Sequence, residues 1–111
     1  MTEDRRGHVR VPGPFDGRRV GALETPVRVY DLSEGGCFIT SFHETEKGRQ
    51  FTLRIDLPYE GWISVRAETL YDKLGFGFAV RFTDMTDDAR ARLDRSLEKI
   101  RGRAPYEGEQ E

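Results

Sequence analysis

Hydrophobic and polar residues alternate along most of the middle of the chain. The pattern has a period of two and is interrupted at short, fairly even intervals by turn-forming residues. Such alternation predicts antiparallel strands that bury one face and expose the other. The expected strands are residues 17–23, 27–30, 37–40, 51–57, 63–71 and 76–82. Strands this short, in so short a chain, favour a six-stranded antiparallel β-barrel, because closure removes exposed strand edges.

The first of these strands is the least regular, and the fifth is the longest. Residues from Val11 to Glu24 are rich in glycine and proline and do not alternate cleanly. Proline lacks the N–H that a sheet needs and glycine favours turns, so this stretch predicts a weak first strand. In the fifth strand the alternation places Tyr71 on the same apolar face as Ile63 and Val65.

The period of the pattern changes near the C-terminus. Thr86 is a suitable N-cap, and Asp87 and Asp88 suit the positive end of a helix dipole. The apolar residues that follow at helical spacing are Ala89, Leu93, Leu97 and Ile100. We expect a helix over about 86–101 that ends at Gly102 and packs its apolar stripe on the barrel.

Length and composition fit one small domain. The 111 residues are 36% hydrophobic and 34% charged, and the net charge of −2 argues against general nucleic-acid binding. We expect a flexible arginine-rich arm at 1–12, the barrel with its helix at 13–102 and a disordered acidic tail at 103–111. Cys37 cannot form an internal disulfide, and the sequence shows neither a secretory leader nor an apolar run of membrane-spanning length. A cytoplasmic protein that does not bind membranes is therefore expected.

The sequence carries no recognisable catalytic constellation. His8 and His43 have no metal-ligand spacing with Cys37. The phosphate-binding loop, the nucleophile elbow and the zinc-protease helix motif are all absent. The run Gly75-Phe76-Gly77-Phe78 resembles a glycine loop only superficially, because its phenylalanines recur at strand period. We expect no enzyme, no metal and no cofactor.

Two polar clusters remain, and each has an ordinary structural explanation. The first is Arg5-Arg6-Gly7-His8-Val9-Arg10, which a solubilising arm would explain. The second is Asp31-Leu32-Ser33-Glu34-Gly35-Gly36, which directly follows a predicted strand. As a turn, this segment would use Asp31 and Ser33 to bond the local backbone and its glycines to adopt positive φ.

Taken together, the two clusters resemble the motifs of the PilZ domain family. The family pattern is Arg-x-x-x-Arg in an N-terminal arm, followed after a strand by Asp/Asn-x-Ser-x-x-Gly. Residues 6–10 fit the first part, with Arg5 as an additional arginine, and residues 31–36 fit the second. Residues 75–82 also look like the family's glycine-marked segment before its C-terminal helix, so the resemblance covers about residues 5–101.

The resemblance implies a receptor for cyclic di-GMP. The residues that would bind this ligand are Arg5, Arg6, Arg10, Asp31, Ser33, Gly36 and Tyr71. The arm would clamp one ligand, or an intercalated pair, against the barrel face and signal to an unidentified downstream protein. Arginine's planar fork matches a phosphate or the O6 and N7 acceptors of guanine. Asp31 would accept from guanine N1–H and N2–H, Ser33 would bond a phosphate or a base edge, Gly36 would allow close approach, and Tyr71 would stack on a guanine.

Two other functions are open from the sequence. A protein with this fold can act without ligand as a protein-interaction module, although such members typically lack the arginines or the Asp-x-Ser motif that this chain keeps. Small barrels with basic arms and surface aromatic residues also bind single-stranded nucleic acids. The net charge of −2 and the acidic C-terminal residues count against that function.

Overall fold

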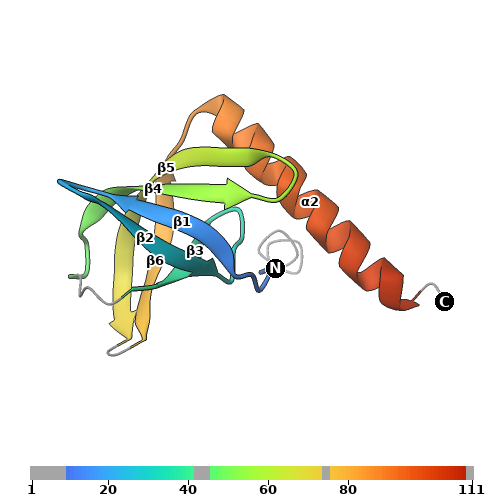
Figure 1. Cartoon of the computed structure of the whole chain (residues 1–111), viewed down its shortest axis with the longest axis horizontal. Coiled ribbons are helices and arrows are strands. Elements are labelled where there is room, and N and C mark those ends of the chain that lie inside the picture. Colours follow the sequence, from blue (N-terminus) through green and yellow to red (C-terminus); the bar gives the residue numbers. More distant parts are fainter. Residues whose placement is uncertain (1–9, 42–45, 74–75, 110–111) are drawn as a thin grey trace, which may run out of the picture.

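The computed structural model describes residues 10–41, 46–73 and 76–109. Its elements are β1 (Phe15–Val20), β2 (Glu24–Tyr30), β3 (Gly36–Thr40), β4 (Gln50–Leu57), β5 (Gly61–Lys73), β6 (Gly77–Asp84) and α2 (Asp87–Glu109). The strands form a closed barrel in the order β1-β2-β3-β6-β5-β4, and all neighbours are antiparallel (Figure 1). The predicted six-stranded barrel with a C-terminal helix is confirmed.

The barrel core consists of the inward half of each alternating strand. Strand β4 shows this most clearly. Its residues Leu53 and Ile55 are buried, while Thr52 and Arg54, which alternate with them, are partly exposed. Cys37 on β3 belongs to the same core, and its burial raises the pKa of the thiol. A thiol in this position behaves as a small apolar side chain rather than as a reactive group.

Strand β1 closes the barrel by pairing with both β2 and β4. It spans Phe15–Val20 rather than the predicted 17–23. Gly17 explains why this strand lacks a clean apolar pattern. A Cβ at Gly17 would lie 2.9 Å from a methyl carbon of Val29 and 3.2 Å from the carbonyl oxygen of Arg54. The position must therefore be small for β1 to fit between its neighbours.

Helix α2 is anchored to the barrel by an apolar stripe and by polar contacts with the β4–β5 turn. Ala89, Leu93 and Leu97 are buried in the barrel core, as the helical spacing predicted. Thr86 caps the helix, since its hydroxyl oxygen accepts from the Ala89 N–H at 3.0 Å. The Ser96 hydroxyl donates to the carbonyl oxygen of Pro58 at 2.8 Å.

The β4–β5 turn is also held by charge. Both carboxylate oxygens of Glu60 accept from Arg95, at 3.2 and 3.0 Å, and Arg92 donates to the Glu60 carbonyl oxygen. The hydrogen bond from Arg95 is the main reason that the pKa of Glu60 lies below its ordinary value. These contacts fix the N-terminal half of α2, whereas Figure 1 shows its last turns extending away from the strands.

Both ends of the predicted barrel unit need correction. Helix α2 continues to Glu109 instead of ending at Gly102, so residues 103–109 are helical and not a disordered tail. A single exposed glycine costs a helix only about 1 kcal/mol relative to alanine, which does not by itself end it. At the other end, Val11 was predicted to lie in the flexible arm, but it is buried in the core. Residues 1–9 of that predicted arm lie outside the described residues.

Candidate functional site

The Asp31–Gly36 segment comprises the loop between β2 and β3 and the first residue of β3, and it is shaped by its own polar groups. The Ser33 N–H donates to the Gly36 carbonyl oxygen at 2.9 Å. The buried Ser33 hydroxyl accepts from the Gly35 N–H at 3.3 Å and donates to the same Gly36 oxygen at 3.4 Å. The predicted local bonding of Ser33 is confirmed. Positive φ occurs at Asp31, with a value of 53°, and not at Gly35 or Gly36.

Gly36 is required by the neighbouring strand. It is buried at the start of β3, opposite Arg81 of β6. A Cβ at this position would lie 2.2 Å from the carbonyl oxygen of Val80. No side chain fits there unless β3 and β6 separate, so the glycine of the motif has a packing role in this fold.

The end of the N-terminal arm is joined to this loop by backbone pairing. Val11 and Leu32 exchange two N–H···O=C hydrogen bonds, each 2.9 Å long. The pairing brings Arg10 beside Asp31, and Arg10 Nη1 donates to the Asp31 carbonyl oxygen at 2.9 Å. Arg10 and Asp31 are both exposed. The structure therefore brings together one residue of each sequence motif, while Arg5 and Arg6 lie outside the described residues.

A groove of about 660 Å³ opens on the outer face of the barrel beside Asp31. Its lining residues are Pro12, Tyr30, Asp31, Phe38, Thr40, Tyr71 and Phe76. The strand register explains the aromatic character of this groove. Tyr30 pairs with Phe38, Phe38 with Ala79, and Ala79 with Tyr71, so three aromatic residues flank one small alanine in a row across β2, β3, β6 and β5. Flat apolar walls beside an arginine and a carboxylate suit a planar ligand that carries both charge and hydrogen-bonding edges.

Tyr71 reaches this groove because of an irregularity in β5. Thr69 pairs with Val80, whereas Tyr71 already pairs with Ala79, so Leu70 is an extra residue in the strand. A bulge of this kind shifts the following side chains to the opposite face. Tyr71 is consequently 59% exposed. The alternation had placed it on the apolar face with Ile63, and that expectation was wrong.

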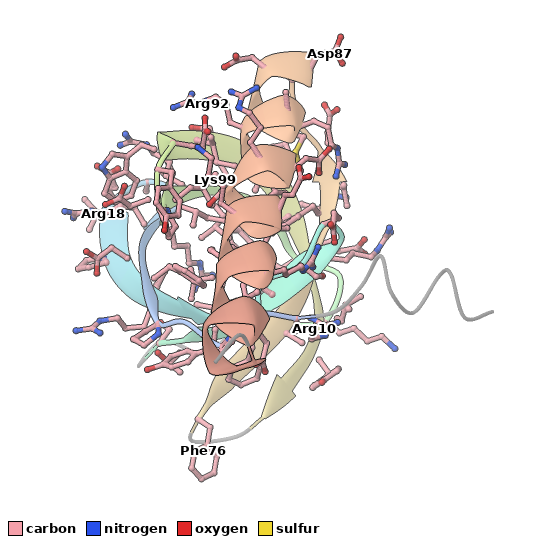
Figure 2. The ribbon with its side chains drawn as sticks, turned by 90° about the vertical axis from the view of Figure 1, so that its right-hand side faces the viewer. Arg10, Arg18, Phe76, Asp87, Arg92 and Lys99 are labelled. Carbon is pink, nitrogen blue, oxygen red and sulfur yellow. The ribbon has the colours of Figure 1, made fainter. Side chains whose placement is uncertain are left out.

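A second groove of about 720 Å³ continues from the first across β1 and β2. The two grooves share Tyr30, Thr40 and Phe76, and the second adds the cationic residues Arg18 and Arg28. Figure 2 shows Phe76 at the tip of the β5–β6 hairpin and Arg18 on the side of the barrel. Phe76 is exposed because it precedes β6, so it does not share the inward face of Phe78 as its spacing suggested.

Several groove residues were not identified from the sequence. Tyr30 and Phe38 are aromatic residues at the outward positions of short strands, where alternation alone predicts polar side chains. Large apolar residues at outward positions were therefore the signal that could have found them. Phe76 and Arg28 carried no comparable signal, because their position beside the groove depends on strand pairing between distant segments.

Within residues 10–41, 46–73 and 76–109, no three His, Cys, Asp or Glu side chains form a group suited to a metal ion. The same ranges contain no helix with both the length and the apolar character needed to cross a membrane.

Comparisons with known proteins point to one family. The family model described as the PilZ domain matches residues 4–99. The chain is similar in structure to the inhibitor of motility MotI/DgrA from Bacillus subtilis, with 18% identity and a TM-score of 0.71, covering 89% of this chain and 52% of that one. No curated protein matches significantly by sequence.

Two structures from Escherichia coli are also similar. YcgR in complex with c-di-GMP has 18% identity and a TM-score of 0.72, and the match covers 92% of this chain and 47% of that one. The PilZ domain of YcgR with c-di-GMP has 18% identity and a TM-score of 0.61, covering 87% and 93%. This chain thus spans about half the length of MotI/DgrA and of the longer YcgR structure. At these identities the likeness concerns the fold.

The packing role of Gly36 can be tested with a matched pair of substitutions. Gly36→Ala should lower the free energy of unfolding by about 1–3 kcal/mol or more, because the added methyl overpacks the contact between β3 and β6. Gly35→Ala should change it little, since a Cβ at Gly35 would meet no atom within 4 Å and its φ is not positive. Chemical denaturation of both variants provides the measurement. Equal stability of the two variants would contradict the packing role.

Proposed function

The chain belongs to the PilZ domain family, and from that premise we propose that it is a cytoplasmic receptor for cyclic di-GMP rather than an enzyme. The observation that carries the proposal is the position of Arg10. Backbone pairing of the next residue, Val11, with Leu32 of the β2–β3 loop holds this arginine against Asp31, at the edge of the aromatic groove. Two similar structures from Escherichia coli contain c-di-GMP, which is consistent with this ligand.

The groove chemistry fits the two parts of a guanine dinucleotide. Arg10 contacts the Asp31 backbone through one nitrogen, and the rest of an arginine fork can face a phosphate or the O6/N7 edge of guanine. We assign the Asp31 carboxylate to guanine N1–H and N2–H. Stacking on an aromatic side chain contributes about 1–3 kcal/mol per base in other nucleotide complexes. Tyr71 is assigned to such stacking, with Tyr30 and Phe38 in the same row of the groove.

The remaining motif residues have different assigned roles. We assign Arg5 and Arg6 to the ligand phosphates or bases, so that the arm clamps the ligand against the barrel. Ser33 and Gly36 are buried and engaged within the fold, so we assign them to shaping the loop that presents Asp31. In this proposal, ordering of the arm changes the surface that a downstream partner protein recognises.

Calorimetric titration with cyclic di-GMP tests the proposal. We expect micromolar or tighter binding, and binding of cyclic di-AMP about ten- to hundredfold weaker, because adenine would leave the Asp31 acceptors unpaired. GTP is the control for general affinity for guanine nucleotides. If cyclic di-GMP does not bind, the proposed function fails. If both cyclic dinucleotides bind with equal affinity, Asp31 does not distinguish guanine from adenine.

Removal of either motif arginine should affect binding and leave the fold intact. Arg10→Ala and Arg6→Ala should each weaken cyclic di-GMP binding by at least about tenfold, since a charge-assisted hydrogen bond contributes about 1.5–3 kcal/mol. The melting temperature without ligand should hardly change, because Arg10 is exposed. Arg66→Ala is a suitable control, since this exposed arginine bonds Thr52 and lines neither groove. A large loss of thermal stability in Arg10→Ala would show a structural role instead.

We further expect two ligands per chain at saturation. Arg5 adds a third guanidinium to the arm, and the aromatic groove continues directly into a second groove with Arg18 and Arg28. A second dinucleotide brings two more negative charges, which such an excess of arginine would offset. The endpoint of the titration measures the stoichiometry, and Arg5→Leu should reduce it towards one. If the wild-type protein binds one ligand per chain and Arg5→Leu does not change that number, Arg5 does not have this role.

A further inference from the structure

The β2–β3 loop is tied to helix α2 through Glu34, the residue between Ser33 and Gly35. Arg101 donates to both carboxylate oxygens of Glu34, from Nη1 at 2.6 Å and from Nη2 at 3.1 Å. Arg90 donates to the Glu34 carbonyl oxygen at 3.1 Å. The helix thus holds both the side chain and the backbone of one residue of the loop.

The geometry of these contacts makes them stronger than an ordinary surface ion pair. Exposed pairs contribute little to stability, but bidentate arginine–carboxylate contacts are specific in direction and stronger. The side chains of Arg101 and Glu34 are only 23% and 28% exposed. Arg90 and Arg101 are 11 positions apart in a regular helix, which places them about three turns apart on nearly the same face. Both arginines therefore face the loop from one side of α2.

Glu34 is separated from the ligand groove. It lines a different cleft, of about 480 Å³, between the loop and the helix residues Asp94, Glu98 and Arg101. Its neighbours in the loop, by contrast, are the residues that present Asp31 to the groove. The loop therefore has one side directed to the groove and the other attached to α2.

We propose that Arg101, assisted by Arg90, is a positioning residue for the ligand loop, and that the Glu34–Arg101 pair couples occupation of the groove to helix α2. This inference rests on the proposed binding of cyclic di-GMP. Arg101 neutralises the Glu34 carboxylate and holds its loop in place. Without Arg101, the Glu34 carboxylate loses its bidentate partner, and the loop must be ordered at the moment of binding.

The direction of the coupling follows from linkage. If the pair favours ligand binding, then the ligand must favour the pair to the same extent. Ligand binding should therefore stabilise the attachment of the loop to the C-terminal half of α2. A partner protein that contacts α2, and not only one that contacts the arm, would therefore detect whether the groove is occupied.

The helix itself provides a matched control. Arg95 makes an equivalent bidentate contact with Glu60, but in the β4–β5 turn, and neither residue lines a groove that contains Asp31. Arg95→Gln and Arg101→Gln each remove one charge and one bidentate contact from the same helix. A difference in ligand affinity between these variants therefore results from where the contact lies and not from the general stability of α2.

The experiment is titration of both variants with cyclic di-GMP, together with amide hydrogen exchange of α2 with and without ligand. Arg101→Gln should weaken binding about fivefold, the lower end of typical coupling between sites. Arg95→Gln should bind like the wild type. In the wild type the ligand should slow exchange of the amides around residues 97–101, and Arg101→Gln should abolish this effect. Should Arg101→Gln not fold, Arg101→Lys is tested in its place, and we expect about twofold weaker binding because lysine keeps the charge without the fork.

Three results would overturn the inference, wholly or in its coupling to the helix, while leaving the receptor function intact. One is wild-type affinity in the Arg101 variant, and another is equal weakening in the Arg101 and Arg95 variants. The third, unchanged exchange of α2 in a ligand-saturated wild-type protein, would exclude the coupling to the helix. Absence of ligand binding by the wild type would instead refute the proposed function, and the inference with it.

Discussion

In a closed barrel every strand has two neighbours, so each side chain must point either into the core or out of it. The inward positions of the described strands are filled by apolar side chains, among them Phe51 and Phe78, whose rings pack edge to face. The proposed ligand groove lies on the outer face, where the register of β2, β3, β6 and β5 brings Tyr30, Phe38 and Tyr71 into one row. Closure also requires small residues where strands approach closely, at Gly17 and Gly36.

The β2–β3 loop is where these constraints meet. Gly36 fixes its end against β6, Val11 fixes its start through Leu32, and Arg101 fixes its middle through Glu34. A loop held at three points presents Asp31 and Arg10 in a defined position before any ligand arrives. In the proposed complex, such preorganisation reduces the entropy that is lost on binding.

Sequence patterns predicted the strands, the helix and its cap because these depend on residues close together in the chain. The two motifs likewise brought Arg10 and Asp31 to attention before their contact was known. What the patterns could not reveal depends on partners distant in sequence. The bulge at Leu70, which turns Tyr71 outward, is visible only in its pairing with β6. The burial of Val11 depends on a single bridge to Leu32, which has no period to detect.

Chemical-shift mapping of the amide resonances during addition of cyclic di-GMP shows both whether the ligand binds and where it binds. We expect the largest changes at Arg10, Asp31 and the strand residues around Phe38 and Tyr71, with smaller changes at Glu34 and in α2 near Arg101. Amides of the β4–β5 turn, near Glu60, should remain unchanged. Saturable changes centred on any other face of the barrel would contradict the proposed binding site, and the absence of any change would contradict ligand binding itself.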